Sequence, residues 1–334
     1  MFALLACVGA IDLDTGGDGV VSGETGVDRF SVEIDEDVLS RLGDRLAEVQ
    51  NDDGSYDWQR AEDEELIPEL TGYQNVTGVS AWGFYAAQER VGEREDWQEA
   101  TARAADYFDG LLDAAIADGS GLSCPNYTVL VWELESNPDP VLEARTIAGF
   151  EAMLSAHDDR ARGFLENLAE RRSAIPGIIP WDDALCVEAA REMSELSPVF
   201  AEDAADAEAV LVAELEDTFL PAWDADPSLL WGDISIGWSL RVLAESQDAE
   251  LIDGLTERLV VLVDEEGRIT NGSDDDGPQQ ATAYGLMGLK AVEHDLSQRV
   301  QDFAESEVDP DGIVLGGAGE TYEVSGELLR ALAE

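Results

Sequence analysis

Beyond residue 31 the chain alternates between two kinds of helical segment, and this alternation constrains the fold more than any other feature. The first kind is charged and amphipathic: in 34–49, Val38, Leu39, Leu42 and Leu46 recur at helical spacing with charged residues between them. Five further segments share this pattern: 97–116, 141–171, 202–220, 248–263 and 296–305. The second kind is rich in glycine, alanine, serine and aromatic residues, and its members are 76–90, 127–135, 182–195, 233–245, 279–293 and 322–333.

A turn separates each charged segment from the small-residue segment that follows it. The turns contain glycine, proline or aspartate and are centred near Gly54, Gly119, Gly177, Asp226, Gly267 and Gly312. Successive centres lie 41 to 65 residues apart, a loose period of one helical hairpin. Three turns are similar in detail: DDGSY at 52–56, EEGRI at 265–269 and DPDGIV at 309–314. The sequence therefore predicts a repeated helical hairpin.

Two concentric rings of helices follow from this alternation. The charged helices would form an outer ring with one face exposed to solvent. The small-residue helices would form an inner ring, where small side chains let neighbouring helices approach closely. Strand-like composition is confined to 312–315 and 127–132, and we expect the second stretch to be helical. The prediction is an all-α domain over residues 31–334, preceded by a flexible polar linker within residues 1–30.

One turn also resembles a known family. Gln50, Asp53, Gly54, Ser55 and Tyr56 follow the order Q-x-x-D-G-S-aromatic. This resembles the repeats of the α/α-toroid superfamily of terpenoid cyclases and protein prenyltransferases, and the two later turns of similar sequence match it in part. The resemblance implies an (α/α)6 toroid of six helical hairpins in two concentric rings, with a central funnel where the inner helices begin. We expect the motif itself to shape the joint between two helices.

The catalytic motifs of that superfamily are not matched. The cyclases use a D-x-D-D motif, and the nearest text is SDDDG at 273–277, where a glycine replaces the last aspartate. The prenyltransferases bind zinc through Asp, Cys and His, but Ala184 stands two residues before Cys186. The two histidines, His157 and His294, are expected at the surface. No metal site and no cofactor is expected, although the NDDG and SDDDG loops carry the oxygen ligands that calcium takes.

The first turns of the small-residue helices would converge on the funnel of such a toroid, so their side chains are the candidate site. The candidates for ligand binding are Asn75, Trp82, Tyr127, Trp181, Trp231, Trp238, Gln280, Tyr284 and Tyr322. Aromatic faces beside amides suit sugars, whose C–H faces stack on rings while their hydroxyls form hydrogen bonds. The same rings could line a pocket for an apolar or cationic ligand. The alternative is that the tryptophans pack between the two rings of helices.

Four carboxylates near the same helix starts are the candidate catalytic groups if the protein is an enzyme: Asp182, Asp183, Asp233 and Glu323. A glycosidase needs two carboxyl groups roughly 5–10 Å apart, one of them with a raised pKa. The alternative is structural, because an aspartate in the first turn of a helix accepts hydrogen bonds from free N–H groups and meets the positive end of the helix dipole.

Three functions fit these residues. The favoured one is a cell-surface protein that binds a carbohydrate or apolar ligand in the funnel without turnover. The second is a carbohydrate-active glycoside hydrolase or lyase that uses a pair of the four carboxylates. The third, a terpenoid cyclase or prenyltransferase-like enzyme, rests on the resemblance alone and would require a mostly apolar funnel.

The charge balance limits the partners. The chain has 74 Asp+Glu against 19 Lys+Arg, for a net charge of −55, and Lys290 is its only lysine. The acidic residues are spread over every segment, which favours a solvated coat adapted to molar salt over a localised polyanionic site. No basic stripe is present to neutralise phosphates, so nucleic acid is excluded as a partner. No residue pattern indicates an oligomeric state.

The N-terminus suggests a lipid anchor. The apolar run 1–6 is too short to span a bilayer and lacks the basic residues of a signal peptide. The sequence LLAC that ends at Cys7 resembles a lipobox, so a lipid on Cys7 would place the protein outside the cell, on the membrane only through that lipid. The alternative is a frayed terminus of a cytoplasmic protein. In an oxidising compartment Cys124 and Cys186 could pair, and two separate buried thiols are the alternative.

Removal of salt tests the acidic-coat interpretation. The Debye length is roughly 3 Å at 1 M salt and roughly 30 Å at 0.01 M, so the self-repulsion of this chain is screened only at high salt. We expect the helical circular dichroism spectrum seen in molar KCl to be lost on dialysis into ~10 mM salt. Retention of that spectrum after dialysis would contradict the interpretation.

Overall fold

The computed structural model describes residues 32–58, 74–156, 160, 180–246, 249–272, 278–316 and 319–334. Residues 32–334 form one compact unit. The described residues are helical apart from turns, two isolated bridges, and β1 (Leu315–Gly316) paired antiparallel with β2 (Gly319–Glu320). The predicted all-α class is therefore confirmed. Cys7, His157 and the SDDDG loop lie outside the described residues.

Each predicted helical segment contains a helix. The charged segments form α1 (Glu36–Val49), α3 (Glu95–Asp118), α5 (Pro140–Ser155), α8 (Ala201–Glu214), α11 (Ala249–Val260) and α13 (Ser297–Ser306). The small-residue segments form α2 (Gln74–Val91), α4 (Cys124–Ser136), α7 (Pro180–Leu196), α10 (Gly232–Leu243), α12 (Pro278–Ala291) and α14 (Tyr322–Ala333). Three short pieces precede or follow α8: η2 (Pro198–Phe200), η3 (Leu215–Phe219) and α9 (Leu220–Ala225).

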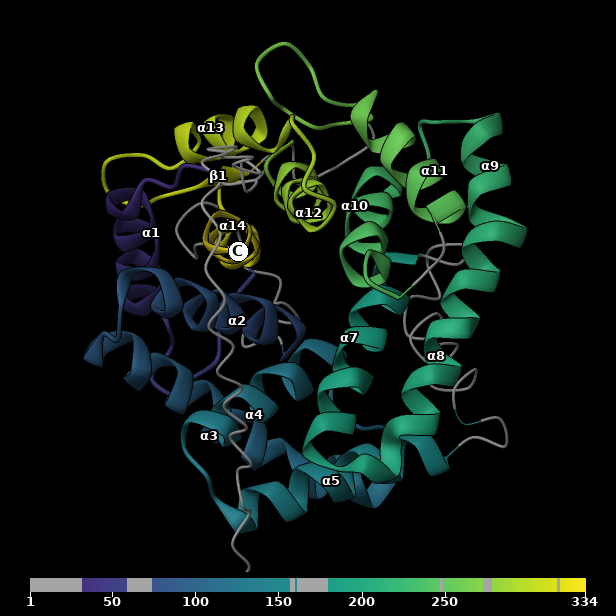
Figure 1. Cartoon of the computed structure of the whole chain (residues 1–334). Helices are drawn as coiled ribbons and strands as arrows, with labels where there is room; N and C mark the ends of the chain where they lie inside the picture. Colours follow the sequence, from purple (N-terminus) through teal and green to yellow (C-terminus); the bar gives the residue numbers. More distant parts are fainter. Residues whose placement is uncertain are drawn as a thin grey trace, which may run out of the picture. The chain divides into compact units, whose positions relative to one another are not determined.

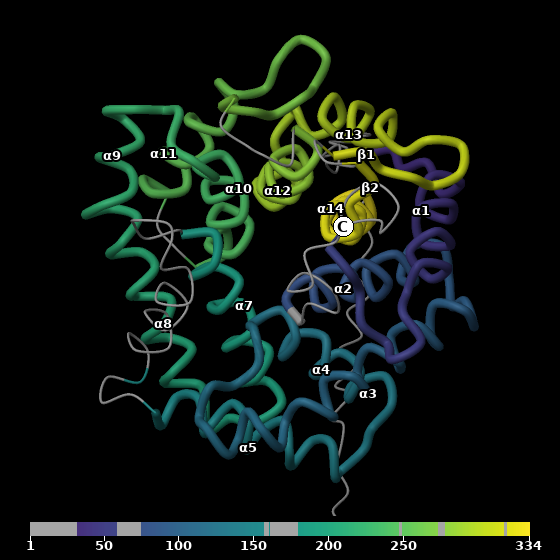
Figure 2. The backbone as a smooth tube through the Cα atoms, turned by 180° about the vertical axis from the view of Figure 1, so that it is seen from behind, coloured from purple at the N-terminus to yellow at the C-terminus, as the bar shows by residue number. Residues whose placement is uncertain are grey.

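The six small-residue helices contact one another in a closed cycle. In the order α2, α4, α7, α10, α12 and α14, each helix packs against the next, and α14 packs against α2 (Figure 1). Figure 2 shows the same order from behind. These helices are buried over most of their surface, whereas the charged helices bury one face. We call the two sets the inner and the outer helices.

Glycines let the inner helices approach closely. A Cβ added at Gly288 of α12 would lie 2.5 Å from the carbonyl oxygen of Gly237 in α10. A Cβ added at Gly326 of α14 would lie 2.3 Å from the carbonyl oxygen of Val79 in α2. Real Cβ atoms do not approach backbone so closely, so any larger residue would push these helices apart. The small residues of the inner segments are thus a packing requirement.

The outer helices turn their apolar stripes toward the inner ones. In α1, which packs against α2 and α14, Leu39 and Leu42 are fully buried. In α3, Trp97 is also fully buried, and its indole N–H donates to the Asp44 carboxylate at 3.0 Å. The acidic residues between these stripes remain on the wet face, as expected for amphipathic helices.

Three joints between outer and inner helices share one geometry. Gly54, Gly267 and Gly312 have left-handed backbones, with φ of 87°, 97° and 78°. A Cβ at each would lie 2.1–2.2 Å from the backbone carbonyl oxygen of an arginine in another outer helix: Arg103 of α3, Arg299 of α13 and Arg41 of α1. The similarity predicted for these three turns is confirmed. Because the Gly312 joint packs on α1, the last hairpin meets the first.

The first joint shows what the Q-x-x-D-G-S-aromatic motif does. The Gln50 amide donates to the carbonyl oxygens of Gly54 and of Ala100 in α3, both at 2.9 Å. The Asp53 carboxylate accepts the backbone N–H of Ser55 at 3.0 Å. Tyr56 is fully buried, and its hydroxyl donates to the Leu46 carbonyl oxygen at 3.1 Å. These hydrogen bonds close the turn or tie it to α1 and α3.

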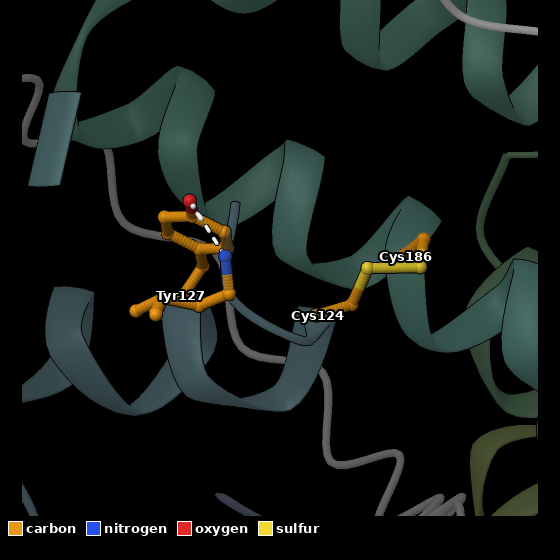
Figure 3. The surroundings of a disulfide bond; sticks show 4 residues. Cys124, Tyr127 and Cys186 are labelled. Atoms are coloured by element: carbon orange, nitrogen blue, oxygen red, sulfur yellow. Dashed lines mark hydrogen bonds between the residues drawn. A yellow bond between two sulfur atoms is a disulfide. The ribbon is translucent and has the colours of Figure 1, made fainter. Parts of the chain in front are cut away.

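A disulfide joins two neighbouring inner helices near their starts. Cys124 of α4 and Cys186 of α7 are bonded, with their Cα atoms 4.9 Å apart (Figure 3). One turn along α4, the Tyr127 hydroxyl accepts the backbone N–H of Leu122 at 3.2 Å. Of the two alternatives for this cysteine pair, the structure shows the disulfide. Cross-linking a loop of this length restricts the unfolded chain and typically stabilises the fold by about 2–4 kcal/mol.

Substitution of a joint glycine tests whether the close approach is needed. In Gly267→Ala the new methyl group meets the Arg299 carbonyl, so we expect the free energy of unfolding to fall by about 3 kcal/mol or more. Gly272→Ala is a matched control, because Gly272 also has a positive φ, 80°, but no heavy atom lies within 4 Å of an added Cβ. Its expected loss is about 1 kcal/mol. Equal losses in urea denaturation in molar KCl would show that the carbonyl contact is unimportant.

Candidate ligand-binding site

A cavity of about 1200 Å³ opens where the inner helices end. Its walls come from the later turns of all six inner helices, with further residues from α3 and from the segments that follow α2, α4, α10 and α14. Most lining side chains are charged or polar, and Tyr85, Trp132 and Met287 are the large exceptions. The cavity therefore lies at the opposite ends of the inner helices from the funnel that the resemblance implies.

Arg330 of α14 is the most deeply buried charged residue of the cavity wall, with 1% of its surface exposed. Its guanidinium donates two hydrogen bonds to the Glu188 carboxylate of α7, at 3.0 and 2.6 Å. Its Nε donates to Glu334 at 2.6 Å. Because α7 and α14 stand three places apart in the cycle of six, the pair crosses the interior.

Three tryptophans from other inner helices surround the same guanidinium. The ring centroids of Trp82 (α2), Trp132 (α4) and Trp238 (α10) lie 4.5, 5.1 and 4.9 Å from the Arg330 Cζ atom. These distances are within the range of cation–π attraction. Together with Glu188, these contacts bring five of the six inner helices to one cation.

An aromatic pair and a fixed carboxylate form the α2–α4 side of the cavity. The rings of Tyr85 and Trp132 meet edge to face, with centroids 5.6 Å apart. The Tyr85 hydroxyl donates to Glu133 at 2.8 Å, and the Asn137 amide donates to the other carboxylate oxygen at 2.8 Å. Burial, and then the charge of Glu133, hold the pKa of Tyr85 well above its usual value. Trp132 is only half-buried and lines the cavity.

The α7 side of the cavity carries a carboxyl group with a raised pKa. Glu188 and Glu192 both line the cavity and lie four residues apart on one face of the helix. Burial, followed by the charges of Glu188 and Glu195, raises the pKa of Glu192 to about 7. A hydrogen bond from the Trp132 side chain opposes this shift. At neutral pH the Glu192 carboxyl group is thus partly protonated and can both donate and accept a hydrogen bond.

The cationic side chains of the α12–α14 side are engaged with the end of α14. Lys290 donates to the carbonyl oxygens of Ala331 and Leu332 at 2.7 and 3.3 Å, and Arg90 donates to that of Ala333 at 2.6 Å. These carbonyls have no partner within the helix, so the contacts satisfy them. Burial lowers the pKa of Lys290 to about 8. The groups best placed for a ligand are therefore Trp132, Tyr85 and the carboxyl groups of α4 and α7.

Five of the predicted ligand-binding residues form one chain of ring contacts inside the cycle. Trp231 contacts Trp181 with centroids 6.2 Å apart, and Trp181 contacts Tyr284 at 5.5 Å. Tyr284 contacts Trp238 at 5.3 Å, and Trp238 contacts Trp82 at 5.5 Å. This series of ring contacts leads from Trp231, which precedes α10, to Trp238 and Trp82 beside Arg330. Trp231 is half-buried and the other four are buried, and none of the five lines the cavity.

A buried carboxylate that the sequence analysis did not single out lies beside this chain. Glu327 of α14 is fully buried, and one of its oxygens accepts the Gln280 amide at 3.1 Å and the Tyr284 hydroxyl at 2.7 Å. Burial, and then the charge of Glu327, raise the pKa of Tyr284 well above its usual value. Gln280 and Tyr284 therefore both belong to this internal hydrogen-bond network.

The predicted catalytic carboxylates are all buried near helix starts. Asp182 and Asp183 are in the first turn of α7, and Glu323 is in the first turn of α14. Asp233 of α10 accepts the backbone N–H of Ile234 at 3.0 Å and that of Asn271 at 2.8 Å. These contacts match the structural alternative, in which an aspartate at a helix start accepts hydrogen bonds from free N–H groups. None of the four lines the cavity.

The remaining predicted residues lie on different parts of the inner helices. Asn75 is half-buried at the start of α2. Tyr127 packs against Phe150 of the outer helix α5, with centroids 5.1 Å apart. The backbone N–H of Tyr322 donates to the carbonyl oxygen of Trp58 at 3.0 Å. The structure thus connects five of the nine predicted ligand-binding residues into one aromatic chain and places these three elsewhere.

Within the described parts of the chain, no cluster of three or more His, Cys, Asp or Glu side chains is arranged to hold a metal ion. No helix in the described ranges is both long and apolar enough to cross a membrane.

No protein-family model, no curated protein and no solved structure matches this chain.

The cavity groups Glu133, Glu188, Glu192 and Arg330 were not predicted as site residues. Their signal in the sequence is charge in the second half of helices that are otherwise composed of small and aromatic residues. A helix buried on all sides tolerates a charge only where it is paired or faces a cavity. The charges near the ends of the inner segments therefore indicate a polar site.

Substitution of Arg330 tests the ion pair across the interior. Arg330→Met leaves the Glu188 carboxylate without its bidentate partner, so we expect the free energy of unfolding to fall by about 3–5 kcal/mol. The double variant Arg330→Met, Glu188→Met removes both charges and is expected to recover at least about 1 kcal/mol of that loss. Urea denaturation of both single variants and the double variant in molar KCl measures the coupling. Strictly additive losses would mean that the two side chains do not interact energetically.

Proposed function

We propose that this protein is an (α/α)6 toroid that binds a hydroxylated ligand, of the carbohydrate class, in the cavity at the ends of its inner helices. The closed cycle of inner-helix contacts and the joint between Gly312 and α1 support the toroid. The observation that carries the binding function is the cavity of about 1200 Å³ in which the half-buried Trp132 faces acidic hydrogen-bonding groups.

The composition of the cavity wall selects the ligand class. A sugar presents a C–H face to an aromatic ring and hydroxyls to carboxyl and amide groups. The cavity offers the Trp132–Tyr85 pair together with Glu133, Glu192 and Asn137. An apolar isoprenoid would displace water from these groups and would offer no hydrogen bond to their remaining donors and acceptors, at a cost of about 1–3 kcal/mol for each group left unsatisfied. The wall therefore favours a hydroxylated ligand over the substrates of terpenoid cyclases.

A glycoside hydrolase or lyase is the second candidate. It is favoured by one observation, the partly protonated Glu192 in the same cavity as the carboxylates Glu133 and Glu188. A general acid that keeps its proton near pH 7 is what glycoside cleavage requires. Assay of the same glycans for new reducing ends distinguishes turnover from binding.

The setting we propose is the outer surface of a cell in concentrated salt. The net charge of −55 supports adaptation to salt, and the disulfide between Cys124 and Cys186 supports an oxidising compartment. A lipid on Cys7 would hold the protein at the membrane. In this proposal the ligand is taken up from outside the cell.

Two matched tryptophan variants test which end of the inner helices binds. Isothermal titration in molar KCl against neutral linear oligosaccharides is expected to identify a ligand. Trp132→Ala removes the stacking face of the cavity and is expected to weaken binding by about tenfold or more. Trp231→Ala removes a tryptophan that is also half-buried but lies before α10, so affinity should stay within about twofold.

Two results would contradict the proposal. Loss of binding in Trp231→Ala but not in Trp132→Ala would move the site to the starts of the inner helices. Absence of binding across the panel, with native circular dichroism, would remove the carbohydrate function.

A further inference from the structure

The buried and half-buried carboxyl groups of the α4–α7 wall have different partners. Glu188 gives both of its oxygens to Arg330, and Glu133 gives its oxygens to Tyr85 and Asn137. Glu192 forms no ion pair with any residue in the described part of the chain. Its hydrogen-bond partner is the Trp132 side chain, so Glu192 is the half-buried carboxyl group beside the half-buried ring, whereas Glu135 of the same wall is exposed.

The charges around Glu192 are negative. Glu188 and Glu195 act on it from its own helix α7, and Glu135 acts on it from α4, where Trp132 also reaches it. The three carboxylates favour the uncharged form of the Glu192 carboxyl group, and the hydrogen bond from Trp132 opposes their effect.

The cations of the adjoining helices are bound by other partners. Arg191 of α7 pairs with Glu208 of α8 and donates to a carbonyl oxygen of α10. Arg241 of α10 pairs with Glu334 at 2.9 Å, and Arg330 of α14 pairs with Glu188. The positive charge of these elements is therefore already compensated, and none of it neutralises Glu192.

We propose that Glu192, as a protonated carboxyl group, donates a hydrogen bond to an uncharged oxygen of a ligand that stacks on Trp132, and so selects neutral sugars over acidic ones. The inference rests on the proposed carbohydrate-binding function. It adds that the ligand is uncharged and that Glu192 recognises it. A protonated carboxyl group donates to a hydroxyl or acetal oxygen, whereas an ionised one only accepts. A sugar carboxylate would meet Glu135 and Glu188 in a partly desolvated cavity, where salt screens charges least.

The direction of the pH dependence follows from this role. Because the pKa of Glu192 is raised to about 7, the donor is present below that pH and is lost as the pH rises through it. Affinity for a neutral oligosaccharide should therefore be high near pH 5.5 and fall by about tenfold or more near pH 8.5.

The test is isothermal titration of the best-binding neutral oligosaccharide, at about pH 5.5 and about pH 8.5 in molar KCl. Glu192→Gln keeps an N–H donor at both pH values, so its affinity should be nearly independent of pH. Glu192→Ala has no donor and should bind weakly at both. Glu195→Gln tests the cause of the shift: Glu195 is exposed and does not line the cavity, but its charge raises the pKa of Glu192, so this variant should keep the pH dependence with its midpoint moved to lower pH.

A ligand-free measurement supports the titration. Protonation of the group beside Trp132 should change the tryptophan fluorescence with a midpoint near pH 7, and Glu192→Gln should abolish that transition. Circular dichroism of each variant excludes unfolding as the cause.

Each result decides between the two proposals. Wild-type affinity that is equal at both pH values overturns the role of Glu192 but leaves the carbohydrate function intact. Tighter binding of a uronate oligosaccharide than of its neutral counterpart overturns the selection of neutral sugars. Absence of any glycan binding at either pH removes the proposed function and this inference together.

Discussion

The buried ion pair between Arg330 and Glu188 is the interaction on which the arrangement of the inner helices depends. Removing a cation and a carboxylate from water costs several kcal/mol per ion, so the pair adds little net stability. Its effect is on geometry. A shift of α7 or α14 along its axis would leave a charge buried without its partner, and the three tryptophans around the guanidinium tie α2, α4 and α10 to the same point. One cation thus contacts side chains from four other inner helices.

The two ends of the inner helices have different chemistry because the helices are parallel. All six contribute their later turns to one cavity, so the negative ends of six helix dipoles meet there. This field disfavours further negative charge. It accounts for the position of the only lysine and of Arg90 against the last carbonyls of α14. At the opposite ends, Asp233 binds backbone N–H groups, as the positive dipole end favours.

The helices and the joints could be predicted from the sequence because their causes are local. A stripe such as Leu39–Leu42–Leu46 and a glycine such as Gly54 show their role within a few neighbouring residues. The site could not be predicted in the same way. Trp132 and Glu192 are distant in sequence and become neighbours only because α4 packs on α7, and the pKa of Glu192 depends on that burial. The disulfide has the same origin, since its cysteines are 62 residues apart and neither carries a local signal.

The joint between Gly312 and the backbone of Arg41 makes the first and last hairpins neighbours. In an open row of helical hairpins, the terminal units need a polar outer face because one side of each remains uncovered. Here α14 and α2 cover each other. The contact between α14 and α2 thus takes the place of the polar outer face that each terminal unit would otherwise need.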